Sequence, residues 1–417
     1  MTGREAARNL RLDGLTGVSS IVYDGDVFRH FTFMVLGDQP YRGSPATSKH
    51  LITQRLSMTY PVYYVDPPPA LFRGLGPANR SAPFPPGVTE AEYNLKVVTP
   101  PAVALPLSTR ARGIDALGQV LLGSYLRRLF RAEKVRNFIL WSFRYNSNHV
   151  MQILRPDVAV YHSVGRYNDV EPGSGNRVLM DEIEAMTVAS AHLVFTSSDL
   201  LFRQFAWAKK ETCYAPMGVD FKLFHTALRA ELKLPDDLAP IPEPRVGYVG
   251  HMEHWLDLPL LEHLAESMPD VSFVYIGRYG PWFRIDPLLR HRNVFMLGPR
   301  QRTTLPAYLK GMNACLIPFK LNELTRHSHP MKIYEYLAAG KPVVSTPIHE
   351  VEKFGEFIEI AGDPREFAAK LRQAIVDRDI NRANARAEIA RHYSWNQRVA
   401  EMLEKIGQFV LGAGPPQ

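Results

Sequence analysis

The stretch HSHPMKIYEYLAAGKPVVS, residues 327–345, contains the signals that decide the fold of this chain. Pro330 suits the first position of a helix because its φ is fixed and it has no N–H to leave unpaired. Gly340 is a typical helix end, and residues 342–346 have the short apolar composition of a buried strand. The stretch therefore predicts a helix that begins near Pro330 and is followed directly by a strand.

The start of this helix is a predicted anion-binding position. The first amide groups of a helix are free to bind a ligand, and the helix dipole adds positive potential there. Lys332 and Glu335 lie one turn apart at this end. A lysine and a glutamate at that spacing are also typical of a solvated helix face, so the pair has two interpretations.

Apolar runs alternate with helical patterns along the chain, which predicts an α/β architecture with parallel sheets. The predicted strands are 30–37, 61–66, 137–142, 157–163 and 191–197 in the first half, and 245–250, 271–277, 293–297, 313–319 and 342–346 in the second. Because 417 residues are too many for one core, we expect two doubly wound, Rossmann-like domains that face a cleft. Ligands are expected at the carboxyl ends of the strands.

Composition suggests where the domains end. We expect a first domain over 1–225, a linker rich in proline and acid over 226–244, and a second domain over 245–394. The last helix, 395–417, is expected to cross back to the first domain. Residues 67–112 hold many prolines and little periodicity, which predicts an irregular insertion over the first sheet.

The overall composition is that of a soluble globular protein, with 46% hydrophobic and 22% charged residues. The two cysteines, Cys213 and Cys315, form no CxxC motif and predict a reduced, cytoplasmic protein without structural zinc. The start lacks the apolar core of a signal peptide, and no apolar run is long enough to span a bilayer. A net charge of +7 is compatible with an anionic partner.

A series of motifs runs through the second half of the chain. They are APMGVDFKLF (215–224), VGYVGHMEHWLDLPLL (246–261), VYIGR (274–278), NVFMLGPRQRTTLPAYLKGMNACLIPF (293–319), HPMKIYEYLAAGKPVVST (329–346) and SWNQRV (394–399). The four motifs from 246 to 346 resemble the donor domain of GT-B glycosyltransferases, most of all family 4 of the teichuronic-acid-biosynthesis type. APMGVDFKLF is similar to the end of the first domain in that family, and SWNQRV to its last helix. Xanthan-type membrane-associated glucuronosyltransferases are similar in design. The resemblance covers residues 155–400 well and the first 150 only in outline.

The resemblance implies transfer of a sugar from a nucleotide-sugar donor to a lipid-linked or polysaccharide acceptor in cell-surface polysaccharide biosynthesis. It assigns Glu335 to the ribose hydroxyls and Lys332 to the pyrophosphate. The amides of Met331 and Lys332 add the positive field of the helix start. Arg278 directly follows a predicted strand, where a guanidinium fork can reach a diphosphate, although a surface arginine would look the same. Gly250, after the first strand of this domain, permits close approach of the backbone to a ligand.

One position departs from the family pattern. His327 lies eight residues before Glu335, where the family often has a glutamate that contacts the donor sugar. A histidine can donate to a sugar hydroxyl or a phosphate, or it can be a plain loop residue. His251 and His254 lack a third ligand, and we see no DxD pair of the sort that holds a metal in the other large glycosyltransferase fold, so we expect no metal and no cofactor besides the nucleotide-sugar co-substrate.

The first domain is expected to recognise the acceptor and to supply any acid–base group. The catalytic candidates are His162 and Asp169, at and beyond the end of the predicted strand 157–163. The intrinsic pKa of a histidine suits proton transfer near neutrality, but a buried core histidine is the other interpretation. Gly37 and Asp38, after the first strand, are the expected acceptor-side residues.

Residues 123–138 combine basic residues with an apolar stripe, which suits the anionic inner surface of a membrane. The basic residues are Arg127, Arg128, Arg131, Lys134 and Arg136, and the apolar residues expected to enter the lipid are Leu126, Leu129 and Phe130. An ordinary amphipathic helix that covers a sheet has the same pattern. The basic residues are dispersed and no nucleic-acid motif occurs, so nucleic acid is not an expected partner.

Two other functions fit the sequence. A sugar-nucleotide 2-epimerase would share the two-domain architecture, and a non-catalytic nucleotide-sugar-binding protein would explain the histidine at position 327.

Overall fold

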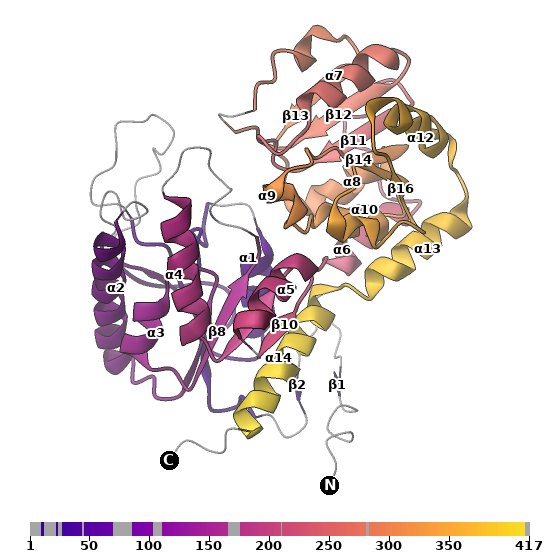
Figure 1. Cartoon of the computed structure of the whole chain (residues 1–417). Helices are drawn as coiled ribbons and strands as arrows, with labels where there is room; N and C mark the ends of the chain where they lie inside the picture. Colours follow the sequence, from indigo (N-terminus) through magenta and orange to yellow (C-terminus); the bar gives the residue numbers. More distant parts are fainter. Residues whose placement is uncertain are drawn as a thin grey trace. The chain divides into compact units, whose positions relative to one another are not determined.

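The computed structural model describes residues 10–11, 22–23, 27–43, 46–69, 86–102, 111–165, 176–209, 211–280 and 283–412. The chain forms two compact units (Figure 1). The first comprises Met1–Pro216 together with Arg398–Gln417, and the second comprises Met217–Gln397. The segment 226–244 therefore lies inside the second unit, and the chain returns to the first unit within its last helix.

The first unit is built on an eight-stranded sheet in the order β10-β9-β8-β7-β3-β4-β6-β5. Its strands are β3 (Thr32–Leu36), β4 (Val62–Val65), β5 (Gly87–Glu90), β6 (Leu95–Thr99), β7 (Phe138–Ser142), β8 (Val158–Ser163), β9 (Leu193–Thr196) and β10 (Thr212–Tyr214). All neighbours are parallel except β5, which is antiparallel to β6. The chain moves away from β3 in both directions, so the topological switch point lies between β3 and β7.

Helices and a small separate sheet complete the first unit. The helices are α1 (Ser48–Ser57), α2 (Arg112–Ala132), α3 (Asn148–Leu154), α4 (Arg177–Ser190), α5 (Asp199–Ala208) and most of α14 (Trp395–Gly412). The strands β1 (Leu10–Arg11) and β2 (Val22–Tyr23) pair antiparallel. Strands such as FILWS in β7 are buried along their whole length, which explains their continuous apolar sequence.

The prediction of an irregular insertion over 67–112 is wrong in part. The strands β5 and β6 lie within it, and β6 is a full member of the sheet, parallel to β4. Four- and five-residue strands near a sheet edge are too short to show a clear period among many prolines. The prolines interrupt this part of the chain without preventing it from joining the sheet.

Helix α2 packs its apolar stripe inward. Leu122, Leu126 and Phe130 are buried in a core shared with strand residues such as Leu140 and Tyr161, and α2, α3 and α4 lie side by side (Figure 1). The expectation that Leu126 and Phe130 enter a lipid layer is therefore wrong. Leu129 is packed against the same core. The apolar periodicity of this helix therefore reflects its packing against the core of the first unit.

The second unit is built on six parallel strands in the order β13-β12-β11-β14-β15-β16. The strands are β11 (Arg245–Val249), β12 (Ser272–Ile276), β13 (Val294–Gly298), β14 (Ala314–Ile317), β15 (Val343–Ser345) and β16 (Glu359–Ile360). Here the switch point lies between β11 and β14. The predicted α/β class with two doubly wound, Rossmann-like parallel sheets is confirmed.

Short helices connect these strands, and longer ones cover the sheet. They are α6 (Phe221–Phe224), α7 (Leu258–Ser267), α8 (Leu305–Lys310), α9 (Glu323–Arg326), α10 (Lys332–Ala338), α11 (His349–Glu352), α12 (Pro364–Val376) and α13 (Ile380–Arg391). The 3₁₀ segments are η3 (His225–Leu228), η4 (Leu288–Arg290) and η5 (Arg302–Thr304).

The stretch from residue 327 folds as its sequence predicts. Helix α10 begins two residues after Pro330, and β15 follows after a short turn. Gly340 ends the helix with a φ of +68°, and a Cβ there would lie 2.8 Å from a methyl group of Leu228. A glycine is therefore required for both conformation and space.

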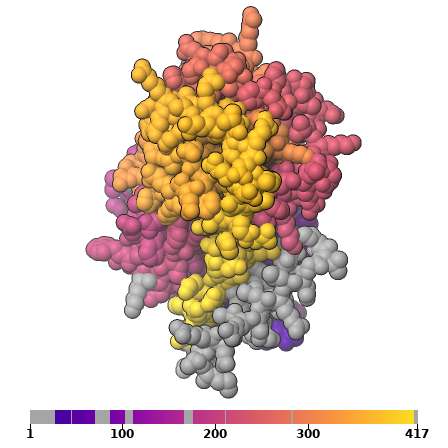
Figure 2. Space-filling model, turned by 90° about the vertical axis from the view of Figure 1, so that its right-hand side faces the viewer, coloured from indigo at the N-terminus to yellow at the C-terminus, as the bar shows by residue number. Residues whose placement is uncertain are grey.

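Helices α13 and α14, yellow in Figure 2, are visible on the face of the molecule that this view shows. Among the helices of the described residues, none combines the length and apolar character needed to cross a bilayer.

Candidate functional site

Lys332 lies at the topological switch point of the second sheet. Its Nζ is 5.1 Å from the ring centroid of Tyr248 on β11 and 5.8 Å from that of Phe319, which follows β14. Both rings attract a cation through their negative faces. They hold the ammonium group beside the carboxyl ends of the two strands that flank the switch point, where ligands of such sheets bind.

Gly250 makes room for this ammonium group. It follows β11 with a φ of +148°, and a Cβ at this position would lie 2.3 Å from Cε and 2.5 Å from Nζ of Lys332. A side chain at this position would require the end of the Lys332 side chain to move. The structure therefore brings together two of the predicted donor-site residues, with Gly250 in contact with the lysine.

Glu335 is almost completely buried, with 6% of its surface exposed. Its Oε1 accepts a hydrogen bond of 2.8 Å from Nη1 of Arg302. Nε of Arg302 donates to Oδ2 of Asp220 at 3.1 Å. Burial alone would lower the pKa of Arg302, but the charges of Glu335 and Asp220 outweigh it and raise that pKa. The pair Lys332 and Glu335 is thus not a solvated helix face.

Arg302 and Asp220 were not among the site residues predicted from the sequence. Asp220 lies in the quoted motif APMGVDFKLF, which was a signal for this position. Arg302 begins η5 and meets Glu335 from 33 residues away in sequence, so no local pattern indicates the pair.

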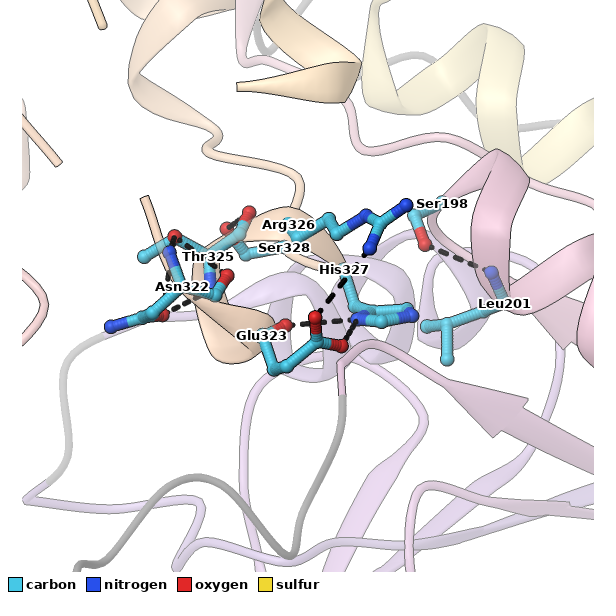
Figure 3. A network of polar contacts seen from close by, with 8 residues as sticks. All are labelled: Ser198, Leu201, Asn322, Glu323, Thr325, Arg326, His327 and Ser328. Atoms are coloured by element: carbon cyan, nitrogen blue, oxygen red, sulfur yellow. Dashed lines mark hydrogen bonds and ion pairs between the residues drawn. The ribbon is translucent and has the colours of Figure 1, made fainter. Parts of the chain in front are cut away.

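His327 ends helix α9 and bonds to its own helix. Its Nδ1 lies 2.8 Å from the carbonyl oxygen of Glu323, so this nitrogen carries the proton and Nε2 is the acceptor in the neutral ring (Figure 3). At the other end of α9, Asn322 and Thr325 form a capping box. His327 is therefore fixed by a short, well-capped helix, and its contact with a donor sugar stays a prediction.

Two further predicted positions lie near the start of α10 and at the end of β12. Met331 is the N-cap residue of α10, and the first amides of a helix have no acceptor within it. Arg278 follows β12 and is exposed, and its carbonyl oxygen accepts from the amide of Met252 at 2.8 Å. Arg278 is thus at the expected edge of the sheet, and its role toward a diphosphate stays a prediction.

The loop after Gly250 contains a carboxylate between two histidines. The Oε1 and Oε2 atoms of Glu253 lie 3.6 Å from Nε2 of His251 and 3.7 Å from Nδ1 of His254. Within the described part of the chain, no three histidine, cysteine or acidic side chains are arranged to hold a metal ion. The expected independence from metal stays a prediction.

The structure contradicts the prediction that His162 is an acid–base group. The residue lies inside β8 with 2% of its surface exposed, and its ring stacks on Phe143. Its Nδ1 accepts a hydrogen bond of 3.3 Å from Nε1 of Trp141. Burial, with a smaller contribution from Lys49, lowers the pKa of His162 to about 3. The ring is a neutral core histidine. Asp169 lies outside the described residues.

The acceptor-side candidates lie at the switch point of the first sheet. Gly37 directly follows β3, and a Cβ there would lie 2.1 Å from the hydroxyl oxygen of Tyr64. Asp38 forms a close ion pair with the buried Lys49 of α1. Asp38 is therefore already paired within its own unit, and its contact with an acceptor stays a prediction.

Comparisons with known proteins agree with this geometry. Residues 258–404 match the family model described as glycosyl transferase-like. This part of the chain is thus a glycosyltransferase-like domain, and the two doubly wound sheets have the GT-B fold, as the motifs predicted. It is 26% identical over 261 residues to the putative teichuronic acid biosynthesis glycosyltransferase TuaH of Bacillus subtilis, across 57% of this chain and 64% of that protein. The match therefore spans a little under two thirds of the relative.

Solved structures of low sequence identity share the fold. A trehalose-6-phosphate protein of E. coli bound with UDP-2-fluoro glucose has a TM-score of 0.66 and 13% identity, over 90% of this chain and 99% of that one. HepE of Anabaena in complex with UDP has a TM-score of 0.61 and 15% identity, over 91% and 100%. The α,α-trehalose-phosphate synthase (UDP-forming) of Burkholderia vietnamiensis has a TM-score of 0.65 and 13% identity, over 93% and 100%.

Proposed function

We propose that the protein is a glycosyltransferase that moves a sugar from a nucleotide-sugar donor to a lipid-linked or polysaccharide acceptor of cell-surface polysaccharide biosynthesis. The observation that carries the proposal is the ammonium group of Lys332, held over Tyr248 and Phe319 at the switch point of the second sheet. The carboxylate of Glu335 lies one helical turn further on.

These two charges match the two halves of a nucleoside diphosphate. Negative charge grows on the diphosphate when the glycosidic bond breaks, and a cation held in place stabilises that charge without reorganising. An ionised carboxylate accepts hydrogen bonds from ribose hydroxyls. In this account Lys332 binds the diphosphate and Glu335 the ribose, with the Arg278 guanidinium and the amide of Met331 as further donors toward phosphate.

We propose uridine as the nucleoside. Supporting this choice, the E. coli protein of the same fold was solved with UDP-2-fluoro glucose, and HepE with UDP. On the acceptor side, the teichuronic acid relative supports a polysaccharide or its lipid-linked precursor. With His162 buried as a neutral ring, Asp169 is the remaining proposed catalytic group of the first unit.

A lipid-linked acceptor would require the protein to reach a membrane surface. We place this contact on the exposed face of α2 and the loop after it. The exposed basic residues there are Arg127, Arg128, Arg131, Lys134 and Arg136. Leu117, Val120 and Leu121 are exposed on the same helix and replace the buried residues as the proposed apolar contacts. An anionic lipid surface attracts such a face by about 1 kcal/mol for each basic residue.

A donor screen tests the proposal. Thermal unfolding is measured with UDP-, GDP- and ADP-sugars, because a ligand that binds only the folded state raises its stability, by about 2.7 kcal/mol at one hundred times Kd. We expect a UDP-sugar to stabilise the protein, and UDP release to require an acceptor. Donor consumption without acceptor would favour the epimerase, and binding without turnover the non-catalytic protein. No stabilisation by any nucleotide sugar would contradict the proposal.

A further inference from the structure

Arg302 connects two carboxylates of the second unit with different nitrogens of one guanidinium. Nη1 donates to Glu335 of α10 and Nε donates to Asp220, the residue before α6. The guanidinium carbon also lies 5.0 Å from the ring centroid of the buried Phe224. Arg302 is thus fixed on two edges and one face, which makes it a rigid partner for Glu335.

Glu335 needs such a partner. A buried carboxylate is costly unless it is paired with a cation and hydrogen-bonded, and a carboxylate without its partner either takes up a proton or turns toward solvent. Protonation would weaken it as an acceptor for ribose hydroxyl groups, and a turn toward solvent would move it out of their reach. Within the described residues, the hydrogen bond and ion pair formed by Glu335 both use Oε1, so Oε2 is available to a ligand.

We propose that Arg302 is the positioning residue that holds Glu335 ionised and oriented toward the ribose of the donor, so that Arg302 determines recognition of the ribose hydroxyls without contacting the sugar being transferred. This proposal rests on the function proposed above. It separates the site into a diphosphate contact, made by Lys332, and a ribose contact, made by Glu335 and maintained by Arg302.

Arg300 offers a matched control in the same loop. Its guanidinium also pairs with an aspartate, Asp237, and its Nε donates to the hydroxyl of Tyr308 at 2.7 Å. It also lies over an aromatic ring, that of Tyr308. Replacement of Arg300 therefore removes an arginine–carboxylate pair two residues away, more exposed than that of Arg302, without touching Glu335.

The test measures Kd for UDP and for 2′-deoxy-UDP by calorimetry with the full chain. Wild type is expected to bind UDP at least about tenfold more tightly, the size of a hydrogen bond to a charged group. In Arg302→Gln this ratio should fall to near one. Arg302→Lys, which keeps the charge but not the fork, should give an intermediate ratio. Arg300→Gln should keep the wild-type ratio, and near-UV circular dichroism confirms that each variant is folded.

The outcomes separate the two proposals. If Arg302→Gln is folded and keeps the wild-type preference for UDP, Arg302 does not position Glu335 and this inference is overturned while the proposed function stands. An equal loss of affinity for both nucleotides would also overturn it, because that result indicates a contact with the diphosphate or general damage. A wild type that binds neither nucleotide would contradict the proposed uridine donor, and this inference with it.

Discussion

The two switch points of the molecule have the same topology and different chemistry. At β11/β14 of the second sheet, the Lys332 ammonium is held by aromatic rings, with the buried carboxylate of Glu335 further along the same helix. At β3/β7 of the first sheet, Asp38 is paired with a buried lysine. The topology of a doubly wound sheet thus creates a ligand-binding position at its switch point. Whether that position can bind an anion depends on whether the charged side chains beside it are already paired.

This comparison predicts its largest effect at Lys332. Lys332→Ala should lower kcat/KM for the donor by about 10²–10³, because removal of one preorganised charge-stabilising group from an active site typically has that effect. Lys222→Ala, at an exposed lysine of α6, should leave the rate unchanged. Steady-state release of the nucleotide measures both. A wild-type rate in Lys332→Ala would show that the switch point of the second sheet takes no part in the reaction.

A substitution at Gly250 tests whether the Lys332 ammonium group needs the space left by the missing side chain. Gly250→Ala should displace the Lys332 ammonium group, since the new Cβ overlaps the flexible end of that side chain, while the free energy of unfolding should fall by little more than the backbone strain. Gly87 has a similar φ of +157°, but no atom lies within 4 Å of its Cβ position, so Gly87→Ala measures the strain alone. Donor affinity should fall only in Gly250→Ala. Equal donor affinities of the two variants would show that the position of the Lys332 ammonium group does not depend on the space at Gly250.

The neutral ring of His162 predicts a pH effect on stability. Its pKa is lowered in the folded protein, to about 3, from an ordinary value of 6.5. The unfolded chain therefore binds a proton that the folded one does not between these values, and stability is lost as pH falls below about 6.5. His162→Phe keeps a ring in the core and should lose less stability between pH 7 and pH 4 than wild type, as chemical denaturation at each pH will show.

The same variant tests the assignment to the core. Because His162 is buried, His162→Phe should keep the wild-type kcat at pH 7. A loss of kcat of more than about 10² in the folded variant, the lower range for a general acid–base group, would restore the catalytic interpretation.

The smallest effect per substituted residue is expected for the binding of α2 to a membrane. Arg127, Arg128 and Arg131 are exposed, and each should contribute about 1 kcal/mol to binding of anionic vesicles. Reversal of all three to Glu should abolish sedimentation with phosphatidylserine vesicles and leave donor binding unchanged. Wild-type sedimentation should fade as salt rises, because screening acts within about 8 Å at physiological ionic strength. Equal sedimentation with neutral vesicles would contradict the membrane contact, and α2 would then serve only to pack against the sheet.

The fold and some of the candidate site residues could be predicted from the sequence because both depend on local signals. Gly340 and the apolar run after it predicted the change from helix to strand, and short motifs singled out Gly250, Lys332 and Glu335 as candidates, which the structure places at one end of the second sheet. Long-range pairs gave no such signal. Arg302 meets Glu335 across 33 residues, and β6 joins the sheet from within a proline-rich stretch. His162 was given a catalytic role because the sequence does not show that β8 stays buried through Ser163, its last residue.

Binding of UDP and UMP to wild type and Lys332→Ala tests the central claim, that the ammonium group at the second switch point binds a diphosphate. The two nucleotides differ only in the β-phosphate. We predict that wild type prefers UDP by about tenfold or more, as expected for a charged hydrogen bond, and that this preference disappears in Lys332→Ala while the affinity for UMP changes little. An unchanged preference for UDP in the variant would contradict the account.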